Sequence, residues 1–491
     1  MSFVFSLIPL NSGLAAEVSQ IRSNPVKMKT SKGAPVDRGC AVGVIFFILG
    51  MGTLLPWNFF LTATQYFTDK LSPEVVNGTV VGKEYYFSNW MTLLSQLPLL
   101  LFTLLNSFLY QRLSERVRVA GSLVFILLLF ILTAALVMVH MQKDSFFSIT
   151  MATIWFINSF GAVLQGSLFG LVGQLPGKYS AVFMSGQGLA GTFAAVAILI
   201  TIASGVNANR AALGYFITPC VGTLITLLCY MLLPRLEFAQ YYFDRSRKQE
   251  AQTEMELLQD APSVTEQVEN CKLNGHSNGS AVEGNGTAVN SQQNGDAEKP
   301  RPAPLGPEAE DGEAKSSIMQ VFRKIWVMAF CVTFVFTVTL SVFPVVTVAV
   351  RTKHPGGNWE RYFIPICCFL AFNVMDWFGR SITSLVQRPC KESWLFPALV
   401  VARVVFIPLL MMCNVDDRQY PPVWFPADWM FTLIMVFFSA SSGYFACLSM
   451  SYAPQLVKPK DCEMVGALMT FFLALGLSLG AALSFPIRLL V

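Results

Sequence analysis

Three residues in the mainly apolar stretch FNVMDWFGRS carry the clearest chemical signal in the sequence. Asp376 and Arg380 are four residues apart, and Asn373 precedes Asp376 by three, so all three share one face of a helix. An ionised side chain at the centre of a bilayer costs about 3 kcal/mol, which makes such residues candidates for function. A carboxylate accepts hydrogen bonds and a guanidinium donates them, so the pair could bind the hydroxyl groups of a ribose.

The spacing alone leaves two other interpretations of this pair open. It could be a structural ion pair that ties helices together. Because D-x-x-G-R resembles the cytoplasmic gating motif of major-facilitator transporters, it could also form a gate. Two further charges in apolar stretches, Arg403 and Glu463, are expected to be structural or gating residues.

Two other apolar stretches hold residues that could contact a planar base. GMGTLLPWNFF contains Pro56, which loosens a helix by removing a backbone donor, and Trp57, which could stack on a base or only fill space. INSFGAVLQGSLFG contains Asn158 and Gln165, and an amide side chain can both donate to and accept from a base edge. The glycines here and in SGQGLAG are typical of close helix contacts.

The elements that must position these residues are predicted to be membrane-spanning helices. Of the 491 residues, 54% are hydrophobic and 13% are charged, against about 25% charged in soluble domains. Lipid excludes open strand edges, and a span needs about 20 apolar residues. The sequence predicts an all-α polytopic membrane protein with eleven transmembrane helices, approximately at residues 40–66, 89–110, 118–140, 147–173, 179–204, 212–234, 320–350, 361–387, 394–414, 424–452 and 462–488.

A long hydrophilic stretch divides these spans into a major-facilitator-like 6+5 arrangement. It is rich in Glu, Asn, Gly, Ser and Pro, and is expected to be disordered because it cannot bury enough apolar surface. Four regions are predicted: a cytosolic tail at 1–39, a six-helix bundle at 40–236 with an external loop at about 67–88, a cytosolic loop at 237–317, and a five-helix bundle at 318–491.

Basic residues before the first span favour a cytosolic N-terminus, and an odd number of spans then puts the C-terminus outside. Arg351, Lys353 and Arg361 would lie on the outer side and disagree with the rule. Asn77, in the sequence Asn-Gly-Thr, falls in the expected external loop, where it is a glycosylation candidate.

Several classes of function are disfavoured by composition and motifs. A net charge of +4 is too small and dispersed to indicate nucleic-acid binding. The eleven cysteines lie mostly in apolar runs, and no CxxC motif occurs, so neither a metal site nor a disulfide framework is expected. No cofactor is implied, and no nucleophile–base pair indicates an enzyme. Without a GxxxxGK[ST] motif and with few carboxylates in the spans, facilitated diffusion is the simplest mechanism; a proton-coupled carrier of another solute is the alternative.

Several stretches together resemble the equilibrative nucleoside transporter family: LGMGTLLPWNFFLTATQYF, INSFGAVLQGSLFG, SGQGLAG, WERYFIPICCFLAFNVMDWFGRS and GALMTFFLALGLSLGA. Two further segments, NWMTLLSQLPLLLFTLLNSFLY and FTVTLSVFP, resemble its type 2 branch most. The resemblance implies sodium-independent, facilitative transport across the plasma membrane by alternating access. Substrates would be nucleosides such as uridine and adenosine, and nucleobases such as hypoxanthine. Nucleoside-analogue inhibitors are also implied.

The resemblance also implies a role for individual residues. The base is expected to be surrounded by Leu54, Trp57, Leu99 and Gln165. The ribose is expected to bind Asp376 and Arg380, the reading that the resemblance favours for this pair. Nearby cavity residues would be Asn58, Phe369, Asn373 and Leu477. The outer gate would include Leu61 and Pro344, and the inner gate Arg118 and Glu463.

Three positions bear on inhibition by nitrobenzylthioinosine: Leu61, Gln96 and Gly161. Glycine at position 161 matches the inhibitor-sensitive type 1 branch, whereas the type 2 branch carries serine there. Leu61 and Gln96 differ from type 1. The resemblance therefore predicts intermediate or appreciable sensitivity.

Overall fold

The computed structural model describes residues 35–71, 74–76, 79–81, 85, 87–109, 113–139, 141–204, 208–246, 248, 318–354, 356–416 and 422–491. Helices dominate because each long apolar run satisfies its backbone hydrogen bonds within itself. The first group comprises α2 (Ala41–Thr62), α3 (Thr64–Leu71), α4 (Phe87–Leu109), α5 (Glu115–Met138), α6 (Lys143–Gly173), α7 (Gly177–Ser204) and α8 (Ala208–Leu232). The second comprises α11 (Ile318–Val342), α12 (Asn358–Phe363), α13 (Ala371–Ile382), α14 (Leu395–Ala402), α15 (Phe406–Met411), α16 (Asp428–Tyr452) and α17 (Cys462–Leu489).

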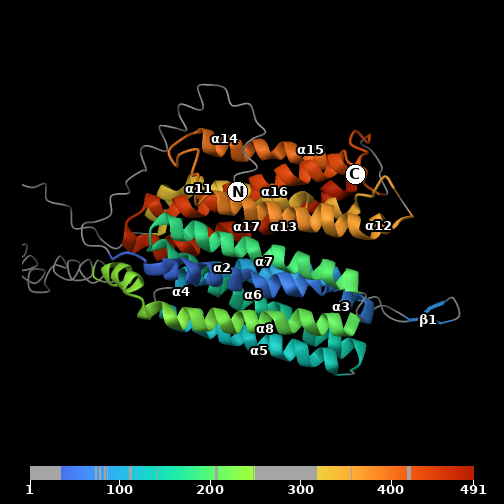
Figure 1. The fold of residues 1–491 in the computed structure, drawn as a ribbon, viewed down its shortest axis with the longest axis horizontal. Helices are drawn as coiled ribbons and strands as arrows, with labels where there is room; N and C mark the ends of the chain where they lie inside the picture. Colours follow the sequence, from blue (N-terminus) through green and yellow to red (C-terminus); the bar gives the residue numbers. More distant parts are fainter. Residues whose placement is uncertain are drawn as a thin grey trace, which may run out of the picture.

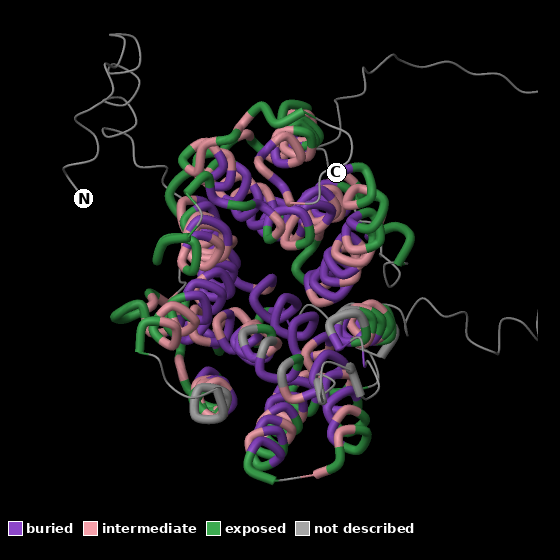
Figure 2. Tube along the Cα trace, turned by 90° about the vertical axis from the view of Figure 1, so that its right-hand side faces the viewer, coloured by how far each residue is buried: buried purple, intermediate pink, exposed green. Residues whose placement is uncertain are grey.

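Nine helical segments of this described part are long and apolar enough to cross a membrane, and two shorter apolar segments, Leu93–Asn106 and Leu395–Met411, accompany them. Each of the eleven ranges expected from the sequence overlaps one of these segments. The total of eleven and the 6+5 division stay predictions. Large apolar side chains such as Leu128, Leu228 and Phe437 are more than half exposed, as expected of a surface that faces lipid. Figure 2 shows buried residues gathered where the helices face one another.

Helices α2 to α8 lie side by side on one side of the molecule, and α11 to α17 on the other (Figure 1). The two groups repeat the same kinds of pairing: α2 packs on α7 as α11 packs on α17, and α4 packs on α6 as α13 packs on α16. The groups meet where α7 contacts α13 and where α17 contacts α4 and α6. Any site between the groups is therefore lined by segments far apart in the sequence.

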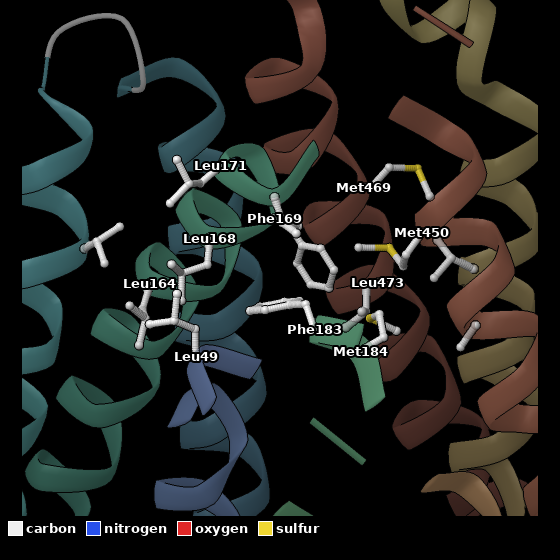
Figure 3. Packing of buried hydrophobic residues seen from close by; sticks show 14 of the residues in the cluster. Leu49, Leu164, Leu168, Phe169, Leu171, Phe183, Met184, Met450, Met469 and Leu473 are labelled. Carbon is white, nitrogen blue, oxygen red and sulfur yellow. The ribbon is translucent and has the colours of Figure 1, made fainter. Parts of the chain in front are cut away.

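A buried apolar cluster joins the two groups (Figure 3). The rings of Phe169 and Phe183 meet edge to face with centroids 4.9 Å apart. Leu473, Met450 and Met469 complete the cluster from the other group, and each is at most 6% exposed. This packing fills the space between α6, α7, α16 and α17 with apolar side chains.

One connecting region differs from the sequence prediction, and another contains a hairpin that the prediction did not specify. Residues 237–246, expected to begin the disordered loop, are helical. Phe238 and Tyr242 are one turn apart and share a face, and the Phe238 ring lies 5.3 Å from that of Tyr179, so apolar packing stabilises this segment. The rest of the predicted loop lies outside the described residues, apart from residue 248. In the predicted external loop, Glu74–Val76 (β1) pairs antiparallel with Thr79–Val81 (β2), while Asn77 lies outside the described residues.

Candidate functional site

A cavity of about 310 Å³ lies between the two groups of helices. That volume suits a small organic ligand. Residues from α2, α4, α5, α6 and α7 line one side, and residues from α11, α13, α16 and α17 line the other. The structure brings together at this cavity every residue that the sequence assigned to substrate binding, the outer gate or inhibitor sensitivity: Leu54, Trp57, Asn58, Leu61, Gln96, Leu99, Gly161, Gln165, Pro344, Phe369, Asn373, Asp376, Arg380 and Leu477.

Asp376 and Arg380 form a buried ion pair on α13. Arg380 Nε donates to Asp376 Oδ2 over 2.7 Å, and each residue is 7% exposed. Among the described residues, the terminal nitrogens of Arg380 have no hydrogen-bond partner, so they can donate to a ligand. The helix is held close to α16 at Gly443, where a Cβ atom would lie 2.0 Å from the carbonyl oxygen of Asp376. Any larger residue would push the pair away from α16.

The opposite wall of the cavity combines apolar and polar side chains. Trp57 lies parallel to Phe60, with an angle of 3° between the rings. Leu54 and Leu99 line the cavity beside it. Gln165, 6% exposed, adds an amide to this wall. The part of this wall around Trp57 thus suits a planar ring, and the corner at Asp376 and Arg380 suits hydroxyl groups.

The cavity also contains polar residues that sequence reasoning did not assign to it. Gln187 Nε2 donates to Thr53 Oγ1 over 3.0 Å, and Thr53 Oγ1 donates to the carbonyl oxygen of Gly50 over 2.7 Å. Thr339 and Ser442 line the other side. Hydroxyl residues are common in membrane helices, where they bond to their own backbone, so no pattern distinguished these. Gln187 lies in SGQGLAG, whose glycines indicated packing.

The two residues assigned to the inner gate lie away from the cavity. Arg118 Nη2 bonds to Glu463 Oε1 and joins α5 to α17. Arg118 Nη1 also donates to Asn106 Oδ1 over 3.4 Å. Beside this pair, α6 and α17 are in backbone contact: a Cβ atom on Gly466 would lie 2.3 Å from the amide nitrogen of Gly170. This end of the molecule is therefore closed between the two groups.

Comparisons with known proteins identify the family and the fold of this chain. The family described as nucleoside transporter matches residues 151–489. Equilibrative nucleoside transporter 2 of Rattus norvegicus is 52% identical over 472 residues, covering 93% of this chain and 99% of that protein. Equilibrative nucleoside transporter 1 of Homo sapiens is 46% identical over 485 residues, covering 94% and 100%. The structure of a major-facilitator proton:xylose symporter superposes with a TM-score of 0.56 at 10% identity, covering 92% of this chain and 89% of that one, and thus shares the fold.

Proposed function

This chain belongs to the nucleoside transporter family, and we propose that it carries purine and pyrimidine nucleosides across the plasma membrane by sodium-independent facilitated diffusion. The family identity makes it a multi-pass membrane transporter of nucleosides and not an enzyme. We further propose that transport is passive and includes nucleobases such as hypoxanthine. We also propose that the N-terminus is cytosolic, that the C-terminus is extracellular and that Asn77 is glycosylated.

One observation carries the proposed binding mode: a single cavity has Trp57 and Gln165 from one group of helices and a buried ion pair from the other. A base lying against Trp57 and Gln165 would place its ribose toward Asp376 and Arg380. A nucleoside such as uridine or adenosine therefore bridges both groups. A nucleobase would use only the first wall, so we expect it to bind more weakly than its nucleoside.

Alternating access follows if the two groups of helices rock about this bridge. In the state described, the end marked by Arg118 and Glu463 is closed, and Leu61 and Pro344 line the cavity toward the other end. A ligand changes such an equilibrium only through contacts that differ between the states. Contacts to both groups at once provide that difference, because they favour the closed geometry around the nucleoside.

Uptake of radiolabelled uridine and hypoxanthine into liposomes that contain the protein tests the passive mechanism. We expect saturable uptake of both, unchanged by a sodium gradient or a pH gradient. Uptake that requires a proton gradient would instead support the proton-coupled alternative, and uptake that requires sodium would also contradict the proposal.

Replacing Glu463 by glutamine tests the inner gate. Arg118 is 4% exposed and would keep its charge without its partner, which costs about 2–5 kcal/mol when a pair is fully buried. Because Glu463 is partly exposed, we expect the lower end of this range, about a 30-fold fall in uridine exchange. The charge-swapped double variant Arg118→Glu/Glu463→Arg should recover part of the activity. Glu360→Gln, at an exposed loop contact, is the control. An equal fall in uridine exchange in Glu463→Gln, the double variant and this control would contradict a gate.

Gly161 offers a test of inhibitor binding at the cavity. A Cβ atom there would meet no other atom within 4 Å, so Gly161→Ser fits without moving the backbone. The new hydroxyl would be buried beneath an apolar inhibitor group, and an uncompensated hydroxyl costs about 1–3 kcal/mol. We expect inhibition of uridine uptake by nitrobenzylthioinosine to weaken about tenfold. Gly121→Ser, at an open position on α5 away from the cavity, should leave inhibition unchanged. An unchanged inhibition constant in Gly161→Ser would place the inhibitor elsewhere.

A further inference from the structure

Arg403 is a buried cation behind the cavity wall. It lies in the 3-10 turn Arg403–Val405 between α14 and α15 and is 2% exposed. Its guanidinium donates to four oxygens on α11 and α16: Val335 O at 3.0 Å, Thr339 Oγ1 at 3.1 Å, Ser441 Oγ at 3.1 Å and Phe438 O at 3.3 Å. So many directed bonds fix the position of the Thr339 hydroxyl.

The protons around Thr339 can be assigned from these contacts. Thr339 Oγ1 lies 2.7 Å from the carbonyl oxygen of Val335, to which it donates its single hydrogen. Its lone pairs then accept from Arg403 and from Ser442, whose Oγ is 3.1 Å away. A hydroxyl has one hydrogen and two lone pairs. Ser442 therefore donates its only hydroxyl hydrogen to Thr339. Its oxygen can then only accept a further hydrogen bond.

Ser442 shares its cavity with the ion pair of the proposed ribose site. It lines the cavity, and its neighbour Gly443 touches the backbone of Asp376. A ligand hydroxyl in this corner would meet a carboxylate, a guanidinium and the lone pairs of Ser442.

Building on the proposed function, we propose that Ser442 is a specificity-determining residue that accepts a hydrogen bond from one ribose hydroxyl. Thr339 and Arg403 are positioning residues. They hold the Ser442 hydrogen away from the cavity, so that the Ser442 oxygen can accept a hydrogen bond from the ligand. The site then selects a sugar that has a hydroxyl at that position over one in which the hydroxyl is missing.

The test compares uridine with its 2′-, 3′- and 5′-deoxy analogues as competitors of labelled uridine uptake. The ratio of each analogue's inhibition constant to that of uridine gives the penalty for losing one hydroxyl. In Ser442→Ala we expect uridine to bind about five- to tenfold more weakly, the size of one net hydrogen bond. One deoxy analogue should bind as tightly as it binds to the wild type, so its penalty relative to uridine should disappear. The penalties of the other two analogues should remain. Three unchanged penalties would overturn the proposal.

Ser439→Ala provides the matched control for Ser442→Ala. Ser439 lies one turn earlier on α16, is fully buried, and donates to the carbonyl oxygen of Met435 over 2.6 Å. Ser439→Ala also removes a serine hydroxyl, but at a position outside the cavity. The penalties of all three deoxy analogues should therefore stay as in the wild type.

The positioning role has its own pair of variants. Thr339→Val keeps the side-chain shape but removes the oxygen that receives the Ser442 hydrogen, and it should abolish the same penalty as Ser442→Ala. Thr339→Ser keeps the hydroxyl and should restore it. If Thr339→Val weakens uridine and all three analogues equally, Thr339 is only structural and the positioning role is wrong. Surface labelling of each variant separates lost protein from lost affinity.

Failure of this inference is distinguishable from failure of the proposed function. If the wild-type protein does not take up uridine, the proposed function is wrong, and the role proposed for Ser442 is wrong as well. If it does, and Asp376→Asn abolishes uptake while Ser442→Ala leaves every penalty unchanged, the function stands and only the role of Ser442 is overturned.

Discussion

Replacing Asp376 by asparagine is expected to lower the efficiency of uridine uptake by about 30-fold or more. The variant keeps the side-chain shape but leaves the buried charge of Arg380 without its partner 2.7 Å away. Removing one partner of a buried, hydrogen-bonded charge pair costs about 2–5 kcal/mol. The substrate also loses a charged acceptor. Kinetics of labelled uridine uptake, normalised to protein at the cell surface, measure the effect.

The same variant separates the three interpretations of the Asp376–Arg380 pair. A ribose ligand predicts a loss of uridine affinity, visible as a raised KM. A gate predicts a lower maximal rate at unchanged affinity, and a structural ion pair predicts less protein at the surface. Asp416→Asn is the control because it breaks an exposed ion pair with Arg351, and such pairs contribute about 0–1 kcal/mol. Unchanged KM in Asp376→Asn would contradict the proposed ribose site.

Replacing Gly466 by alanine is expected to hold the inner end open and to reduce uridine exchange by about tenfold or more. The added methyl group would lie 2.3 Å from the backbone nitrogen of Gly170, so α6 and α17 could not approach as they do here. Overpacking costs about 1–3 kcal/mol. Because the clash exists only when this end is closed, the cost shifts the equilibrium between states by about five- to 150-fold.

Gly121→Ala controls for helix effects of the substitution, because a Cβ atom there meets no atom within 4 Å. A cysteine-reactive reagent applied from the cytosolic side should label Cys462, next to Glu463 at the start of α17, faster in Gly466→Ala than in the wild type. Cys462 is 4% exposed in the closed state. Unaltered labelling together with normal exchange would show that this contact does not gate the cavity.

Much of this architecture could be predicted from the sequence, because a span is defined by the length of an apolar run. The Asp376–Arg380 pair was also predictable, since residues four apart on a helix share a face. The count of spans was harder: α14 and α15 are each short because the 3-10 turn at Arg403 separates them. Residues 237–246 resemble a hydrophilic loop in composition, and only the packing of Phe238 on Tyr179 shows that they form an apolar helical face.

The polar network behind the cavity could not be predicted from the sequence. Arg403 stood out as a charge in an apolar run, but its partners belong to α11 and α16, more than 30 residues away in either direction. Nothing in the local pattern of Thr339 or Ser442 differs from other hydroxyl residues that bond to their own helix. Their orientation toward the cavity arises only from packing between helices.

We propose that the cavity between the two groups of helices carries nucleosides passively. Counterflow of uridine in proteoliposomes without any ion gradient tests it most directly. Vesicles loaded with unlabelled uridine should transiently accumulate labelled uridine above the outside concentration, and Asp376→Asn should abolish this overshoot. No overshoot in the wild-type protein, or one that appears only with an imposed ion gradient, would contradict the account.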